Sequence, residues 1–415
     1  MSTKLFDLVS FARLHSPYYR ELYRHLPKDL PSNLSPADLP LVESKSFWEA
    51  NSLEDNQLLT GPMHEGIIFK SGGTSGAPKF SVFTQTEWNS FCASFGEGLR
   101  IGGVKEGERV ANLFYVGELY ASFIFIMKSF ELATKTMQLP IAGATEISKM
   151  VSQLKELNAT TVAGTPSTMV QIADYVLSKN ISLPNLKKFL FGGEHLYDDQ
   201  RDYLKRVFPD AMIQSIGYAS VDAGLLGFAD VNCLPCEHRS FGRETIYEII
   251  DTETQQVITE LGRVGKAYIT YLDRRLMPII RYPVGDQAMW TEEEGQLNRK
   301  FKLVGRSEEA ARVGPVSLFY DDLFELFSRD PFQLSGLQIL ITHSQQKDQL
   351  TLRVVTQNKI SSSHFLEVLL VERAMIADEV EKGHIHLPVI EVLSFDQLER
   401  NPRTGKMMRV IDRRS

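Results

Sequence analysis

The chain has 415 residues, of which 43% are hydrophobic and 23% charged, and its formal net charge is −7. This composition is typical of a soluble globular protein, and it excludes a disordered, collagen-like or coiled-coil chain. The acidic balance argues against nucleic acid as a partner. At about 150 residues per domain, the length predicts two or three domains.

The cysteine content and the apolar runs predict the compartment. Three cysteines, an odd number, cannot build a disulfide framework, and this favours a reducing environment. The most apolar run, residues 121–127, ends at Lys128, whereas a membrane span needs about 20 residues. The N-terminal segment lacks the apolar core of a signal peptide. We therefore expect a cytoplasmic enzyme that binds no membrane.

The predicted elements follow one another in a regular order. Apolar spacing predicts a helix over residues 5–25, then strands at 66–70 and 80–84 on either side of a Gly/Ser/Thr loop. A helix over 86–99 follows, with Thr86 as its N-cap. Strand-like and helical runs then alternate, which predicts βαβ units and a largely parallel sheet. The strand-like runs are 109–115, 160–163, 188–191 and 211–216, and the helical runs are 121–132, 147–157, 168–177 and 199–207.

The pattern of predicted elements changes at about residue 240 and again at about residue 305. Short strands and turns over 240–305 predict a smaller β-rich subdomain, and an α+β pattern fills the remaining hundred or so residues. The predicted fold class is therefore α/β. A large N-terminal domain at 1–305 would hold mixed or parallel sheets flanked by helices and the β-rich subdomain. A small, mobile α+β domain would occupy 306–415.

Residues 71–79 (SGGTSGAPK) form the strongest local signal. Glycines allow close backbone approach to a phosphate, hydroxyls add donors and the lysine adds positive charge. A flexible surface turn is the alternative. The loop is not a Walker A motif, because it lacks Gly-Lys-Ser/Thr and a strand follows the lysine. The predicted phosphate-binding residues are Ser71, Gly72, Gly73, Thr74, Ser75, Gly76 and Lys79.

Five segments in the same order resemble the motifs of the adenylate-forming superfamily. They are SGGTSGAPK, GYASVD (217–222), RYPVGD (281–286), GRSEE (305–309) and PRTGK (402–406). The stretches HSPYYRELY and LPLVESK, with GTPS at 164–167 and GGE at 192–194, resemble the phenylacetate–CoA ligase-like branch. The resemblance covers nearly the whole chain.

The resemblance implies ATP-dependent activation of a carboxylic acid as acyl-AMP, with release of pyrophosphate and then transfer to a thiol. CoA is the expected acceptor, and a carrier-protein pantetheine or a protein residue is the alternative. A non-catalytic nucleotide-binding homologue is a third hypothesis, which retention of the motif lysines disfavours. In this family the small domain rotates about a hinge, here residues 307–309. A homodimer is left open.

The resemblance also implies roles for individual residues. Lys406 and Lys79 would stabilise phosphate charge during catalysis, and Asp222 would hold Mg²⁺. Tyr218 would stack on adenine, and Asp286 and Arg306 would bind the ribose or phosphates. Four of these residues have an alternative role. Tyr218 could be a core aromatic and Asp286 a carboxylate in a turn. Arg306 could form a surface ion pair, and Lys406 could be a solvated lysine. The expected nucleotide-binding residues also include Gly193 and Glu194.

Three departures from the family pattern bear on function. Val221 and Asp222 stand where the family has threonine and glutamate, which removes one hydroxyl near the phosphates. Glu308 and Glu309 replace paired aspartates at the hinge and keep their charge. Pro315 follows Gly314, which places the entry of a pantetheine arm in question.

Two further groups of residues have two interpretations each. Cys233, Cys236 and His238 have the spacing of three ligands of a structural Zn²⁺, with His195 or a carboxylate as the fourth. Two buried cysteines and a surface histidine are the alternative. The resemblance places an acyl pocket near aromatic residues that favour an aryl or short-chain acid, although aromatic residues at such spacing also form cores. Its predicted walls are Phe114, Tyr115, Tyr120, Gly164 and Gly192.

Overall fold

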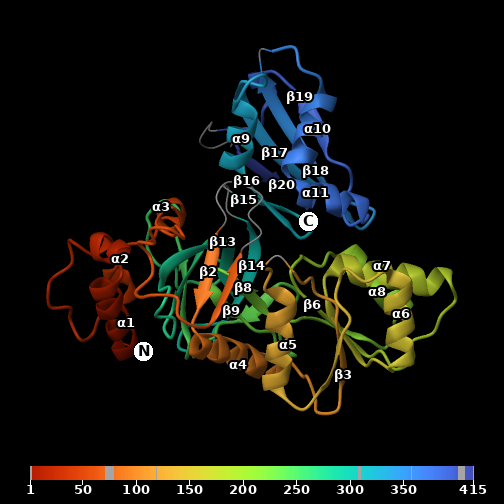
Figure 1. The fold of residues 1–415 in the computed structure, drawn as a ribbon, viewed down its shortest axis with the longest axis horizontal. Coiled ribbons are helices and arrows are strands. Elements are labelled where there is room, and N and C mark those ends of the chain that lie inside the picture. The colour runs from red at the N-terminus through yellow and green to blue at the C-terminus, as the bar shows by residue number, and fades with distance from the viewer. Residues whose placement is uncertain are drawn as a thin grey trace.

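A computed structural model describes residues 2–70, 79–117, 119–306, 310–356, 358–400 and 407–414. The chain forms a broad lower body, with the C-terminal part above it (Figure 1). The predicted N-terminal helix is two helices, α1 (Ser2–His15) and α2 (Pro17–Leu22). The break falls at Ser16, whose side chain accepts from the Tyr19 backbone N–H and caps α2. Short helices η1 (Pro36–Asp38) and α3 (Ser44–Glu49) follow.

A five-stranded parallel sheet in the order β4-β3-β5-β6-β7 confirms the predicted βαβ pattern. Successive residues of one strand enter different cores, because side chains alternate across a sheet. In β5, Val162 packs on the α6–α8 side and Ala163 on the α4–α5 side. The strand β4 was not predicted. The bounds are β3 (Arg109–Asn112), β4 (Met137–Pro140), β5 (Thr161–Gly164), β6 (Lys188–Phe191), β7 (Met212–Ser215), α5 (Ser122–Ala133), α6 (Ile147–Glu156), α7 (Pro166–Ser178) and α8 (Asp198–Val207).

Helix α4 (Gln85–Ile101) begins one residue earlier than predicted. Its N-cap is Thr84, whose side chain accepts from the Glu87 backbone N–H over 3.1 Å, and Glu87 Oε2 accepts from the Thr84 N–H over 2.8 Å. The prediction of Thr86 as the cap was wrong, because this reciprocal capping box satisfies two backbone donors at Thr84.

A five-stranded antiparallel sheet forms the β-rich part, in the order β10-β14-β13-β12-β11. It contains β10 (Glu237–Arg239), β11 (Thr245–Ile250), β12 (Gly265–Tyr271), β13 (Ile279–Trp290) and β14 (Lys300–Arg306). Two separate two-stranded hairpins precede it in the chain, and strand β9 of the second contacts β11 and β12. The hairpins are β1 (Ile67–Lys70) with β2 (Phe80–Phe83), and β8 (Tyr218–Ser220) with β9 (Gly224–Gly227).

The C-terminal part has its own apolar core, which draws only on residues from Ala311 onward among those described. A mixed sheet β19-β18-β17-β20 packs with helices, and the hairpin β15–β16 faces the lower body (Figure 1). These layers confirm the predicted fold class, whereas the exact boundary at 305/306 stays a prediction. The bounds are β15 (Ala310–Val313), β16 (Val316–Phe319), α9 (Tyr320–Ser328), β17 (Leu334–Ser344), β18 (Lys347–Thr356), α10 (Ser362–Glu372), α11 (Ala374–Glu381), β19 (Val389–Val392), η2 (Phe395–Gln397) and β20 (Val410–Asp412).

No helix in the described part of the chain is both long enough and apolar enough to cross a membrane.

Candidate active site

A cavity of about 1690 Å³ lies between the carboxyl ends of the parallel strands, the β-rich sheet and the C-terminal part. This is the edge at which open α/β sheets bind ligands. The cavity brings together most of the predicted site residues for which the structure describes side chains. They are Lys79, Phe114, Tyr115, Tyr120, Gly192, Gly193, Glu194, Tyr218, Asp222, Cys236, His238 and Asp286.

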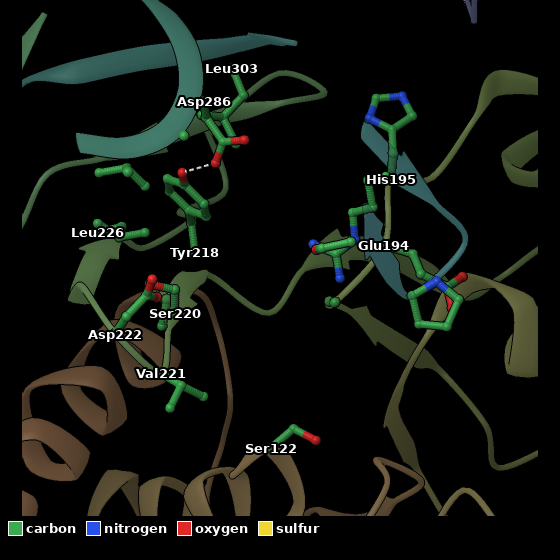
Figure 2. A pocket seen from close by; sticks show the side chains of 18 of the residues that line it. Ser122, Glu194, His195, Tyr218, Ser220, Val221, Asp222, Leu226, Asp286 and Leu303 are labelled. Atoms are coloured by element: carbon green, nitrogen blue, oxygen red, sulfur yellow. Dashed lines mark hydrogen bonds between the residues drawn. The ribbon is translucent and has the colours of Figure 1, made fainter. Parts of the chain in front are cut away.

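Tyr218 and Asp286 lie together on one side of the cavity, opposite Glu194 and His195 (Figure 2). The Tyr218 hydroxyl donates a hydrogen bond to Asp286 Oδ2, which joins hairpin β8–β9 to strand β13. The Tyr218 ring also lies 5.7 Å from the His238 ring, centroid to centroid. The arrangement presents an aromatic ring beside a carboxylate, as the sequence predicted for a nucleoside.

Asp222 lies at the turn of the same hairpin, and two groups orient it. The Tyr282 hydroxyl donates to Asp222 Oδ2 over 2.9 Å, and Trp48 Nε1 donates to that hydroxyl over 3.0 Å. The Asp222 backbone carbonyl accepts from Arg274 Nη1 over 2.5 Å. The Asp222 carboxylate is thus held in a fixed orientation at the cavity wall.

Lys79 lies beside the C-terminal part. Its ammonium is 4.3 Å from the centroid of the Phe319 ring on β16 and 5.5 Å from that of Trp48. Burial lowers the pKa of Lys79, and the charges of Asp222 and Asp322 oppose this shift. A partly desolvated cation next to Asp222 is suited to an anionic ligand.

Gly192, Gly193 and Glu194 form the opposite wall, directly after β6. Gly193 has a φ of +80°, and a Cβ at Gly192 would lie 2.6 Å from the Ile216 side chain, so both positions favour glycine. Glu194 Oε2 accepts from the Ser167 hydroxyl over 2.5 Å, while Oε1 is buried with no partner among the described residues. Burial raises the pKa of Glu194, and the hydrogen bonds from Ser167 oppose this.

Three phenylalanines that the sequence analysis did not single out for the acyl pocket line the cavity beside Phe114. Phe125 of α5 stacks on Phe91 with a centroid separation of 4.5 Å and lies 4.7 Å from Phe95. Phe91 and Phe95 lie in the segment predicted only as a helix, residues 86–99, and apolar residues at helical spacing are equally typical of a core helix. Gly164 does not line the cavity, because Leu113 covers it, 3.2 Å from where its Cβ would be.

The candidate zinc ligands are not gathered around one point. His238 Nε2 lies 2.9 Å from Ser215 Oγ, Cys236 Sγ lies 3.8 Å from His195 Nδ1, and Cys233 Sγ accepts from the Asp230 N–H. The described residues contain no group of three His, Cys, Asp or Glu side chains arranged to hold a metal. Cys236 has a φ of +66°, so its side chain leaves the alternation of the strand that begins at Glu237.

Comparison with known proteins shows similarity to CoA ligases, in sequence and in fold. No family model matches the chain. It is 25% identical over 304 residues to phenylacetate–CoA ligase of Pseudomonas putida, a match that spans 68% of this chain and 66% of that relative. It is 24% identical over 429 residues to phenylacetate–CoA ligase of Aromatoleum evansii, across 98% of this chain and 92% of the relative.

Among solved structures, 2-hydroxyisobutyryl-CoA ligase with 2-HIB-AMP and CoA in the thioesterification state has a TM-score of 0.74 at 18% identity. The alignment covers 100% of this chain and 89% of that one. The same ligase in the postadenylation state has a TM-score of 0.59 at 18% identity, with 99% and 88% covered. The chain therefore has the fold of these ligases and a distant sequence similarity to phenylacetate–CoA ligases.

Only some residues of the motif-like segments line the cavity. RYPVGD contributes Tyr282 and Asp286, whereas its Arg281 bonds Glu248 Oε1 over 3.0 Å and the Leu39 carbonyl over 2.6 Å, inside the core. In GRSEE, the Arg306 backbone pairs with Asp286. Other predicted residues lie outside the described ones: Ser71, Gly72, Gly73, Thr74, Ser75, Gly76, Ser307, Glu308, Glu309 and Lys406.

Proposed function

We propose that this protein activates a carboxylic acid with ATP and transfers the acyl group to a thiol, CoA being the preferred acceptor. The acid's oxygen attacks the α-phosphorus and pyrophosphate leaves. The thiolate then attacks the acyl carbon and AMP leaves. The observation that carries the proposal is the convergence of Tyr218–Asp286, Asp222 and Lys79 on one cavity in an adenylate-forming fold.

The nucleotide would lie between the two walls of the cavity. Asp286 would accept hydrogen bonds from ribose hydroxyls, and adenine would lie between Tyr218 and the Gly193–Glu194 backbone. Lys79 and the loop at 71–76 would neutralise the β- and γ-phosphates, and Arg306 would reach the ribose or phosphates. Lys406 would stabilise charge at the α-phosphate during adenylation.

A magnesium ion fits the donors that the cavity presents. Mg²⁺ is commonly bound by one or two carboxylates together with substrate phosphates and waters. Asp222 supplies one such carboxylate at the cavity wall, oriented by Tyr282. Bound there, the ion would offset the negative charge of the phosphates. The aspartate is one methylene shorter than the family's glutamate, so a water ligand would bridge the longer gap to the ion.

The acid would occupy the aromatic end of the cavity. Phe91, Phe95 and Phe125 are all buried and line it together with Phe114 and Tyr115. Such a wall favours a flat aryl acid or a short-chain acid, because a long chain needs an open tunnel between side chains.

The placement of the small domain supports a thiol-transfer arrangement. The chain fits the thioesterification-state structure of 2-hydroxyisobutyryl-CoA ligase with a higher TM-score than the postadenylation state of the same ligase. Arg312, Gly314 and Pro315 of the β15–β16 hairpin line the cavity, on the side a pantetheine arm would enter. We propose that residues 306–415 rotate about 307–309 between the two half-reactions.

Acid-dependent exchange of labelled pyrophosphate into ATP tests the first step. A panel of aryl and short-chain acids should include at least one that supports exchange. No exchange with any acid would contradict the proposal and favour a non-catalytic homologue. Thioester formation with CoA is then compared with loading of a phosphopantetheinyl carrier protein, and faster carrier loading would reassign the acceptor.

A further inference from the structure

Asp348 is a buried carboxylate that joins three separate segments of the C-terminal part. Its Oδ1 lies 2.9 Å from His343 Nδ1, and its Oδ2 accepts from Arg414 Nη1 over 2.6 Å. The same Oδ2 accepts from the Gly314 backbone N–H over 2.9 Å. Strand β17, the chain beyond β20 and the turn between β15 and β16 therefore meet at one side chain.

Two of these partners, His343 and Arg414, also contact the large N-terminal body. The His343 ring lies 3.9 Å from the Tyr197 ring, and His343 Nε2 lies 3.2 Å from Asp199 Oδ1. The Arg414 guanidinium lies 5.8 Å from the centroid of the Tyr197 ring. Tyr197 and Asp199 stand at the start of α8. This end of α8 is a docking face for the small domain, and the Asp348 carboxylate holds the two side chains that contact it.

The third partner is part of the cavity wall. Gly314 has a φ of +53°, and a Cβ there would lie 2.8 Å from Ile385 Cγ2, so the turn is tightly constrained. The hydrogen bond to Asp348 fixes the direction of the Gly314 amide. A single carboxylate thus connects the docking face on α8 with the hairpin that lines the cavity.

We propose that Asp348 is a positioning residue for the thiol half-reaction. It couples docking of the small domain on Tyr197 and Asp199 to the placement of the Gly314 turn where the thiol arm enters. This inference rests on the proposed function. When the small domain rotates for adenylation, the contacts to Tyr197 and Asp199 break, so adenylation does not depend on the coupling.

The test compares D348N with D412N. Asp412 also binds Arg414, through Oδ1 to Nε over 2.8 Å and through Oδ2 to Nη2 over 2.5 Å. Its side chain bonds neither His343 nor Gly314 in the described part of the chain, so it is a matched control for loss of a carboxylate on Arg414 alone. We expect D348N to lower the rate of thioester formation from preformed acyl-AMP and to raise KM for CoA. The value of kcat/KM for CoA should therefore fall about tenfold. Pyrophosphate exchange should stay within about twofold of wild type. D412N should stay near wild type in both assays.

D199N tests the other side of the coupling, and it removes a half-exposed charge at the surface, where a substitution costs little stability. Like D348N, it should lower the rate of thioester formation from acyl-AMP, by about threefold. Equal losses in both half-reactions of D348N, or wild-type thioester formation in D348N, would overturn the inference. So would an effect of D412N as large as that of D348N.

Hydrogen exchange separates this inference from the proposed function. In D348N, amides at the start of α8 should exchange faster than in wild type, whereas amides of β5 should not change. This measurement needs no substrate. If wild type shows no pyrophosphate exchange, the proposed function fails, while the coupling is still decided by protection at residues 197–204. Unchanged protection there in D348N would refute the coupling.

Discussion

The Tyr282 hydroxyl donates a hydrogen bond to Asp222 Oδ2 over 2.9 Å, although 60 residues separate the two in the chain. Trp48 Nε1 in turn donates to Tyr282. A carboxylate proposed to bind Mg²⁺ is therefore oriented by a tyrosine from another superfamily motif. Two motifs that are separate in sequence act as one unit in the structure.

Removing that hydroxyl should weaken the first half-reaction. A hydrogen bond to a charged group contributes about 1.5–3 kcal/mol, so Tyr282→Phe should lower pyrophosphate exchange about tenfold, chiefly through a higher KM for MgATP. The matched control is Tyr247→Phe, because the buried Tyr247 hydroxyl has no partner among the described residues. Equal exchange in wild type and Tyr282→Phe would show that Tyr282 does not orient Asp222.

Arg281 should contribute to the stability of the fold, although it begins one of the segments that resemble the superfamily motifs. It pairs with Glu248 over 3.0 Å, and both side chains are 5% exposed. Removal of one partner from a buried pair costs about 3–5 kcal/mol, so Arg281→Met should lower the free energy of unfolding by that amount in urea titrations. Arg263→Met removes a half-exposed cation whose ion pair is screened by solvent, and it should leave the free energy of unfolding near that of wild type. Similar losses in both variants would contradict the assignment.

His238 should make the protein acid-sensitive. Burial lowers the pKa of His238 to about 4, below the 6.5 of an exposed histidine. Between these values the unfolded chain binds a proton that the folded chain does not, so stability falls as pH decreases, by up to about 1.4 kcal/mol per pH unit. His238→Gln should flatten this slope between pH 6.5 and 4 in urea titrations. His364→Gln, at a half-exposed position, is the control, and parallel slopes in wild type and His238→Gln would refute the prediction.

Phe125 should limit the size of the acid. Its ring lines the cavity against Phe91 and Phe95, so Phe125→Leu should open space at the aromatic end. The ratio of kcat/KM for an acid one or two methylenes longer to that for the preferred acid should rise about tenfold. Phe130→Leu on the same helix alters a fully buried ring outside the cavity and should leave the ratio unchanged. A constant ratio in Phe125→Leu would place the acid elsewhere.

Local pattern was sufficient for much of the fold. The alternation of strand-like and helical runs predicted β3, β5, β6 and β7 with their helices, because side-chain periodicity is a local property of the chain. The mistakes were local as well. Thr84 rather than Thr86 caps α4, and Pro17 divides the first helix, because backbone donors and prolines act over only a few residues.

Residue type and order determined which chemistry to expect, and only the tertiary structure decided which side chains meet. Asp222, Tyr218 and Asp286 were predicted as site residues from their motifs, but not that Tyr282 orients Asp222. The Cys233–His238 spacing indicated metal ligands, yet in the structure Cys233, Cys236 and His238 each contact a different partner. The Asp348 contacts join residues up to 66 positions apart. Such pairings depend on how the sheets and domains pack, and no local periodicity records that.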